Sequence, residues 1–215
     1  MFHKTNTLVS IVVAVLCSTM EIKPPSPPEI AISMAIDPPN FVPGCSEAPT
    51  ISITATSHAT QPITIFTWPT IFNLQLAQRR KNFTCVDLTS NTPVFLELTK
   101  GPRRPGFSRT KGTGDDKYFF TLEPETPFTF KDSFQLAFRP TEGDLALAQG
   151  HRYRYSVSDG EALHHWWYGR RDDIMAPKGQ PRLLSEASGE PITLGSAASV
   201  EFEVRHVDSA GEKGV

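Results

Sequence analysis

The sequence predicts an all-β fold built from short antiparallel strands. Segments of five to eight residues alternate apolar and polar side chains, as strands with one buried face do. Nineteen Pro and 14 Gly are spread through the 215 residues without a repeat, which suits many strands joined by turns. Leu147, Gly150 and Tyr153 have the spacing L-x-x-G-x-x-Y of a tyrosine corner. Together these features predict an antiparallel immunoglobulin-like β-sandwich of about nine strands with long loops.

The expected strands follow one another with little helical periodicity. Segment 63–68 is denser in apolar residues than the others, as expected of a strand covered on both faces. For residues 70–80 a strand is favoured over one short helix. Segments 83–88 and 94–99 predict a hairpin. The remaining strands are expected at 29–36, 50–57, 118–122, 128–130, 134–138, 152–157, 191–194 and 200–204.

Segment 152–157 follows the corner and is expected to be a central strand. Its alternation places Tyr153, Tyr155 and Val157 on one face and Arg152 and Arg154 on the other. By contrast, residues 100–117 hold six basic residues, four Gly and two Pro. They predict a long mobile surface loop that contributes nothing to a core.

The N-terminus predicts a secretory signal peptide over residues 1–19. Lys4 precedes an apolar run over 8–17, and small residues follow it. The alternatives are a mis-assigned start, with Met20 opening a cytoplasmic protein, or an extra hydrophobic strand. An intact Met1 or Met20 in the native protein would exclude secretion. The expected organisation is a signal peptide at 1–19, a Pro-rich connector at 20–29, the sandwich at 30–205 and a flexible tail at 206–215.

Secretion would permit two modifications. Cys45 and Cys85 would remain after signal removal and could form one disulfide, although two unpaired core cysteines are the alternative. Asn82-Phe83-Thr84 is a glycosylation sequon, usable only if Asn82 is exposed.

Charge and hydropathy exclude two classes of partner. The formal net charge of −2 argues against a nucleic-acid binder, which normally carries a basic excess. No run of 18 apolar residues is present, so no transmembrane segment is expected in the mature chain.

Residues 163–173, LHHWWYGRRDD, form the main candidate ligand-binding segment. Adjacent aromatic rings beside arginines could stack on a sugar, an aromatic small molecule or a partner protein. The alternative is that the segment continues as a strand and at least one Trp belongs to the core. The candidate ligand-binding residues are His164, His165, Trp166, Trp167, Tyr168, Arg170 and Arg171.

No motif predicts catalysis, a metal or a cofactor. Adjacent histidines on a strand point to opposite faces, and no H-x-H, H-x-x-x-H or C-x-x-C pair is present. The G-x-S-x-G elbow is also missing. No catalytic residue, metal site or cofactor is therefore assigned.

Four segments carry a resemblance to other proteins. Residues 62–68, 115–120, 150–155 and 166–170 are similar to small proteins of filamentous fungi that have no assigned activity. The similarity covers most of residues 30–205. It implies an immunoglobulin-like fold and a fungal source, and it transfers no site.

Two functions follow as hypotheses. The first is a non-enzymatic binding or interaction module that uses the segment 163–173. The second is an enzyme or accessory protein of fungal small-molecule, or secondary, metabolism with an aromatic-lined pocket. A cell-surface or inhibitor-like sandwich presenting the loop at 100–117 is a further structural option.

Overall fold

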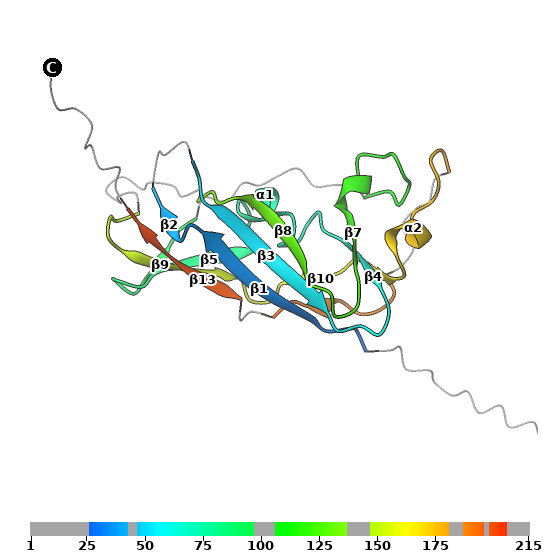
Figure 1. The fold of residues 1–215 in the computed structure, drawn as a ribbon, viewed down its shortest axis with the longest axis horizontal. Helices are drawn as coiled ribbons and strands as arrows, with labels where there is room; N and C mark the ends of the chain where they lie inside the picture. The colour runs from blue at the N-terminus through cyan, green and yellow to red at the C-terminus, as the bar shows by residue number, and fades with distance from the viewer. Residues whose placement is uncertain are drawn as a thin grey trace, which may run out of the picture.

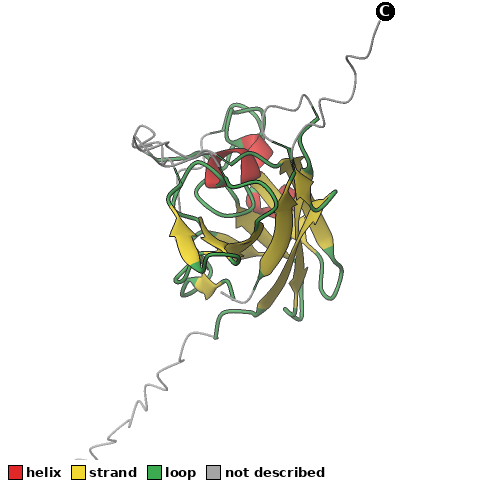
Figure 2. Cartoon of the chain, turned by 90° about the vertical axis from the view of Figure 1, so that its left-hand side faces the viewer, coloured by secondary structure: helices red, strands yellow, loops and turns green. Residues whose placement is uncertain are grey.

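The computed structural model describes residues 26–42, 47–96, 106–136, 147–180, 187–195 and 198–205. Strands make up most of their regular structure, and the helices are single short turns (Figure 2). The all-β fold is confirmed, and its several antiparallel sheets are consistent with a β-sandwich. The strands are β1 (Ile30–Asp37), β2 (Asn40–Phe41), β3 (Thr50–Ser57), β4 (Ile63–Phe66), β5 (Phe83–Asp87), β6 (Thr92–Val94), β7 (Phe119–Leu122), β8 (Phe128–Ser133), β9 (Arg152–Val157), β10 (Ala162–Leu163), β11 (Trp166–Tyr168), β12 (Ile192–Thr193) and β13 (Ser199–Val204). The helices are α1 (Leu74–Ala77) and α2 (Arg171–Ile174).

Two sheets enclose the main core. One has the order β1-β3-β8 and the other the order β2-β13-β9-β5-β6. Figure 1 shows β1, β3 and β8 in front of β5, β9 and β13. All pairs are antiparallel except β2 with β13, which is parallel. The burial patterns of β1, β3 and β9 alternate along each strand, as the sequence predicts.

The core consists of the inward-facing residues of both sheets. Ile51, Ile53 and Ala55 of β3 are fully buried, and Tyr153 and Tyr155 of β9 oppose them. The arginines of β9 lie on the outer face, where Arg152 and Arg154 pair with a carboxylate of β13. The predicted inner and outer faces of β9 are confirmed, because only one face of this sheet is covered by the other sheet.

The tyrosine corner is present at the start of β9. The backbone N–H of Ala148 donates to the Tyr153 hydroxyl oxygen at 2.7 Å. Gly150 has a φ of 74°, a conformation that glycine adopts without strain, and its N–H donates to Val204. The corner therefore ties the chain before β9 to the neighbouring strand β13.

A third sheet is assembled from three separate insertions. Its order is β11-β4-β7, and its strands come from the connections β9–β13, β3–β5 and β6–β8 respectively. One face carries Trp166, Ile65 and Phe120 against the main core. The opposite face carries Trp167 and Phe119 in a second cluster. All four residues of β4 are buried, which confirms that this strand is covered on both sides.

Residues 70–80 form a helical turn, so the favoured strand is wrong. The buried residues Ile71, Leu74 and Ala77 stand at helical spacing rather than at alternate positions. The Thr70 hydroxyl accepts from the N–H of Phe72 and so supports the turn that leads into α1. Local hydrogen bonding of this kind gives no signal in a period-two pattern.

The segment 100–117 is not a surface loop throughout. Residues 100–105 lie outside the described residues, but Phe107 stacks on Phe66 with ring centroids 3.8 Å apart. The Arg109 side chain is buried, and its guanidinium lies 5.0 Å from the Trp167 ring centroid. The prediction that nothing here packs is therefore wrong for 106–117, because arginine can lie flat on an aromatic ring.

Two further predicted segments differ in extent. The hairpin is confirmed as β5 with β6, in which Cys85 pairs with Val94, but β6 begins at Thr92 and residues 97–99 lie outside the described residues. The strand expected at 134–138 is absent over 134–136, where the backbone N–H of Gln135 bonds to a side chain of α1's C-cap instead. Residues 137–138 and the tail at 206–215 lie outside the described residues.

Candidate binding site

The predicted ligand-binding segment is two strands and a helical turn rather than one strand. β10 pairs with β12, β11 pairs with β4, and His164 and His165 lie between them. Within β11, Trp166 and Tyr168 point to one face and Trp167 to the other, because successive side chains of a strand alternate.

Both tryptophans belong to cores. Trp166 has an exposed fraction of 0%, and its indole N–H donates to the carbonyl oxygen of Glu190 at 3.0 Å. Trp167 has an exposed fraction of 4% and packs against Phe119. The core interpretation is confirmed, and it applies to both rings because β11 lies in a sheet covered on both faces. The two indoles therefore do not form an exposed stacking platform.

The two arginines of the segment make ion pairs with the neighbouring insertion. Arg170 forms a fork-like pair with Glu123, with N–O distances of 2.8 and 3.1 Å. Arg171 pairs with Asp116, whose pKa is lowered by a hydrogen bond from the Gly112 backbone and by this arginine. These contacts tie α2 to the segment around β7, so the guanidinium groups already have carboxylate partners.

The remaining residues of the segment are more accessible. His164 is exposed, whereas His165 and Tyr168 are half-buried. Burial and the neighbouring His164 lower the pKa of His165. The His165 ring lies 4.9 Å from that of Phe107 at an edge-on angle. Ligand binding by the seven predicted residues stays a prediction, with His164 and Arg170 as the exposed residues of the set.

The two predicted modifications depend on residues with different surroundings. Asn82 has an exposed fraction of only 8%, and its side-chain amide donates to Glu161 at 2.8 Å. The exposure that the sequon requires is therefore not met. Cys85 is a buried free thiol, and Cys45 lies outside the described residues, so the disulfide stays a prediction.

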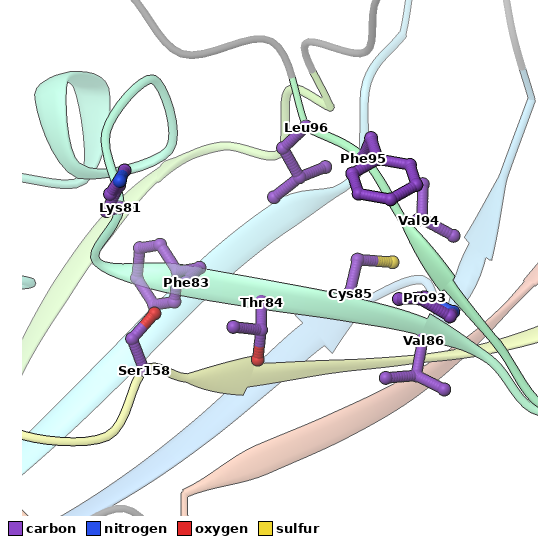
Figure 3. A pocket seen from close by; sticks show the side chains of 10 residues that line it. All are labelled: Lys81, Phe83, Thr84, Cys85, Val86, Pro93, Val94, Phe95, Leu96 and Ser158. Atoms are coloured by element: carbon purple, nitrogen blue, oxygen red, sulfur yellow. The ribbon is translucent and has the colours of Figure 1, made fainter.

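An apolar cavity of about 600 Å³ lies along β5 and β6. Figure 3 shows Phe83 and Cys85 on one side of the β5 ribbon, with Phe95 and Leu96 from the end of β6 above them. Phe95 is 81% exposed at the cavity. The lining residues are Lys81, Phe83, Thr84, Cys85, Val86, Pro93, Val94, Phe95, Leu96 and Ser158.

The cavity has few polar groups and no ionised nucleophile. Burial and the nearby Asp87 carboxylate raise the pKa of the Cys85 thiol to about 12, so the thiol is protonated at neutral pH. Lys81 supplies the cationic side chain among the lining residues. Such a site can hold an apolar molecule and offers little for bond making.

The sequence predicts a hairpin at these residues but no binding site there. Val94, Phe95 and Leu96 are three consecutive apolar residues, so in an extended chain at least one must point away from the core. That apolar run was the signal in the sequence for an exposed apolar side chain at this position. The walls of the cavity come from residues that only pairing of β5 with β6 brings together.

Among the described residues, no group of three or more His, Cys, Asp or Glu side chains is arranged to hold a metal ion. None of the helices that the structure describes is long and apolar enough to cross a membrane. Comparison with protein-family models and with curated proteins found no match to this chain.

Proposed function

We propose that this protein is a non-enzymatic binding module that holds a small, largely apolar molecule in the cavity beside β5 and β6. The observation that carries the proposal is the cavity itself, with its apolar lining and the exposed Phe95 ring at its opening. Its volume of about 600 Å³ lies in the range of small-molecule sites. The buried tryptophans and paired arginines of 163–173 act as supports for the third sheet.

A second candidate is an accessory protein or enzyme of fungal small-molecule metabolism. The cavity favours it, since an apolar pocket with aromatic walls can hold a reactive intermediate with few polar groups. Chemical change in a bound compound would support this candidate over simple binding. Secretion stays a prediction, because residues 1–25 lie outside the described residues.

We also propose that the two main sheets have immunoglobulin-like topology. In this assignment β1, β3 and β8 are strands A, B and E, and β5, β6, β9 and β13 are C, C′, F and G. Two features support it: the tyrosine corner stands at the start of strand F, and β2 pairs in parallel with G as a continuation of A. The insertions that form the third sheet then occupy the B–C, C′–E and F–G connections.

The proposed site is tested with the neutral fluorescent probe N-phenyl-1-naphthylamine. We expect the purified protein to bind the probe with increased fluorescence. Phe95→Ala should weaken binding about fivefold, since aromatic contacts contribute on the order of 1 kcal/mol. Leu96→Trp, which adds volume to the cavity wall, should weaken binding further.

Thr92→Ala is the matched control. Thr92 is an exposed residue of β6 that lines neither this cavity nor the groove between α1, β7 and β8. Its replacement should leave probe binding unchanged. No binding by the wild type, or equal losses in Phe95→Ala and Thr92→Ala, would contradict the proposed site.

A further inference from the structure

A second groove lies between α1, β7 and β8, and its chemistry differs from that of the first cavity. Its volume is about 440 Å³. Figure 1 shows α1 beside β8, and these two elements are in contact. The lining residues are Thr67, Phe72, Asn73, Leu74, Gln75, Lys117, Tyr118, Phe120, Phe128, Thr129, Phe130, Lys131 and Asp132.

One wall of the groove is a continuous set of phenylalanine rings. The Phe130 ring centroid lies 4.8 Å from those of Phe72 and Phe128 and 5.2 Å from that of Phe120. Phe128 is 37% exposed, so this set of rings reaches the surface. A flat aromatic ring fits such a wall by offset or edge-on stacking.

The free edge of β8 adds hydrogen-bond donors to the groove. The N–H of Phe134 donates to the carbonyl oxygen of Pro49. Along an antiparallel strand every second residue bonds to the same neighbour, so the backbone groups of Phe130 also point toward β3. The N–H groups of Thr129 and Lys131 therefore point away from β3. Farther along this edge, Gln78 bonds to the carbonyl oxygen of Ser133 and to the N–H of Gln135.

The open part of the edge is short. It runs over residues 129–131, between Pro127, which has no N–H, and the stretch bonded to Gln78. An added peptide strand needs a longer edge than this. A small acceptor group, such as a carboxylate, needs only one or two N–H donors.

The charges that line the groove also favour an anion. Lys117 and Lys131 are the basic residues among the lining residues, and Asp132 is the acidic one. Asp132 shares a face of β8 with Phe128 and Phe130. The carboxylate of Asp132 accepts from the N–H of Ser133 at 2.7 Å. Lys117 lies over the Tyr118 ring, with its ammonium nitrogen 5.1 Å from the ring centroid. An aromatic wall, the N–H donors of the β8 edge and an excess of basic over acidic residues therefore occur together in the lining of this groove.

We propose that this groove is a second binding site, for a planar aromatic ring that carries a carboxylate. The ring lies on Phe120, Phe128 and Phe130, and the carboxylate accepts from the β8 edge and the lysine ammonium groups. The site is separate from the cavity beside β5 and β6 in residues and in ligand charge, so it does not depend on the proposed function.

The test compares 2-naphthoate with the neutral 2-naphthamide by isothermal titration calorimetry at low ionic strength. We expect 2-naphthoate to bind about fivefold more tightly, the effect of one partly exposed charge interaction. Lys131→Gln should reduce this difference without changing the affinity for 2-naphthamide, because Lys117 and the N–H donors of the β8 edge remain. Phe128→Ala should weaken the binding of both compounds about fivefold, because both rings use the same wall.

Phe95→Ala is the matched control, and circular dichroism checks the fold of each variant. Unchanged binding of 2-naphthoate to Phe95→Ala supports the assigned groove. Three results would overturn it: no binding of 2-naphthoate, equal affinity for the acid and the amide, or a loss in Phe95→Ala with none in Phe128→Ala. The last result would place the compound in the cavity beside β5 and β6.

Discussion

Tyr153 and Tyr155 show that one residue type in one strand can have two different energetic roles. Both side chains lie on the inner face of β9 and are buried. The Tyr153 hydroxyl bonds to the Ala148 backbone, whereas the Tyr155 hydroxyl has no hydrogen-bond partner among the described residues. Burial raises the pKa of both phenols. The corner spacing predicted the role of Tyr153, and nothing local distinguishes Tyr155.

This contrast predicts opposite effects of removing each hydroxyl. Tyr153→Phe should lower the free energy of unfolding by about 1–3 kcal/mol, since the N–H of Ala148 loses its acceptor. Tyr155→Phe should leave stability unchanged or raise it slightly, because a buried polar group without a partner is removed. Urea unfolding of both variants measures this. Equal losses in the two would rule out the corner as the source of the effect.

At the scale of elements, the side chain of one glutamine, Gln78, joins the end of α1 to the end of β8. The amide of Gln78 donates to Ser133 at 2.9 Å and accepts from Gln135 at 2.8 Å, as a strand partner would. It thereby blocks part of a free sheet edge, which proteins generally protect from pairing with other chains. The helical turn was the alternative interpretation of residues 70–80. The contact was not predictable, because Gln78 and Ser133 meet only in the folded chain.

Loss of this contact should therefore be costly. Gln78→Ala is expected to lower the free energy of unfolding by about 1–3 kcal/mol, because two backbone groups near a buried site lose their partners. Gln75→Ala is the control: this residue is an exposed glutamine of the same helical turn, and its replacement should change stability by less than about 0.5 kcal/mol. Thermal or urea unfolding provides the comparison. A similar small effect in both variants would show that Gln78 does not protect the edge.

At the scale of the whole molecule, three insertions build a third sheet on a two-sheet framework. Ion pairs join these insertions, as in Arg170 with Glu123 and Lys111 with Asp172. Each is exposed to solvent, so each contributes little alone. The second apolar cluster, with Phe66 and Trp167, provides the larger part of the cohesion. The two grooves lie on the framework and its junction with this sheet rather than on the segment 163–173.

The free energy of unfolding should be highest at pH values between the acidic pKa of Asp87 and the alkaline pKa of Cys85. Burial opposes ionisation of Asp87, but hydrogen bonds from His151 and from the following turn hold its pKa below 3.8. This contribution is present above pH 3.8 and is lost as the pH falls through the lower folded value. For Cys85 the folded pKa is about 12 against 9.0, so stability is lost as the pH rises above 9.0.

Urea unfolding as a function of pH tests this window. We expect a plateau near neutral pH, with losses below pH 3.8 and above pH 9.0. Asp87→Asn should flatten the acid side, and Cys85→Ser should flatten the alkaline side. An unchanged acid profile in Asp87→Asn would mean that other carboxylates dominate acid unfolding.

The sequence by itself determined the class of fold, the main strands and the corner. Period-two alternation and the L-x-x-G-x-x-Y spacing are local patterns. They are present in the sequence whenever a strand buries one face, whatever segment covers that face. Tertiary structure alone decided that Trp166 and Trp167 are both core, that Arg109 is buried and that two grooves exist. The burial of Trp166, Trp167 and Arg109 depends on segments from different insertions lying together. Burial of a side chain is a property of what covers it, and the covering residues are far away in the chain.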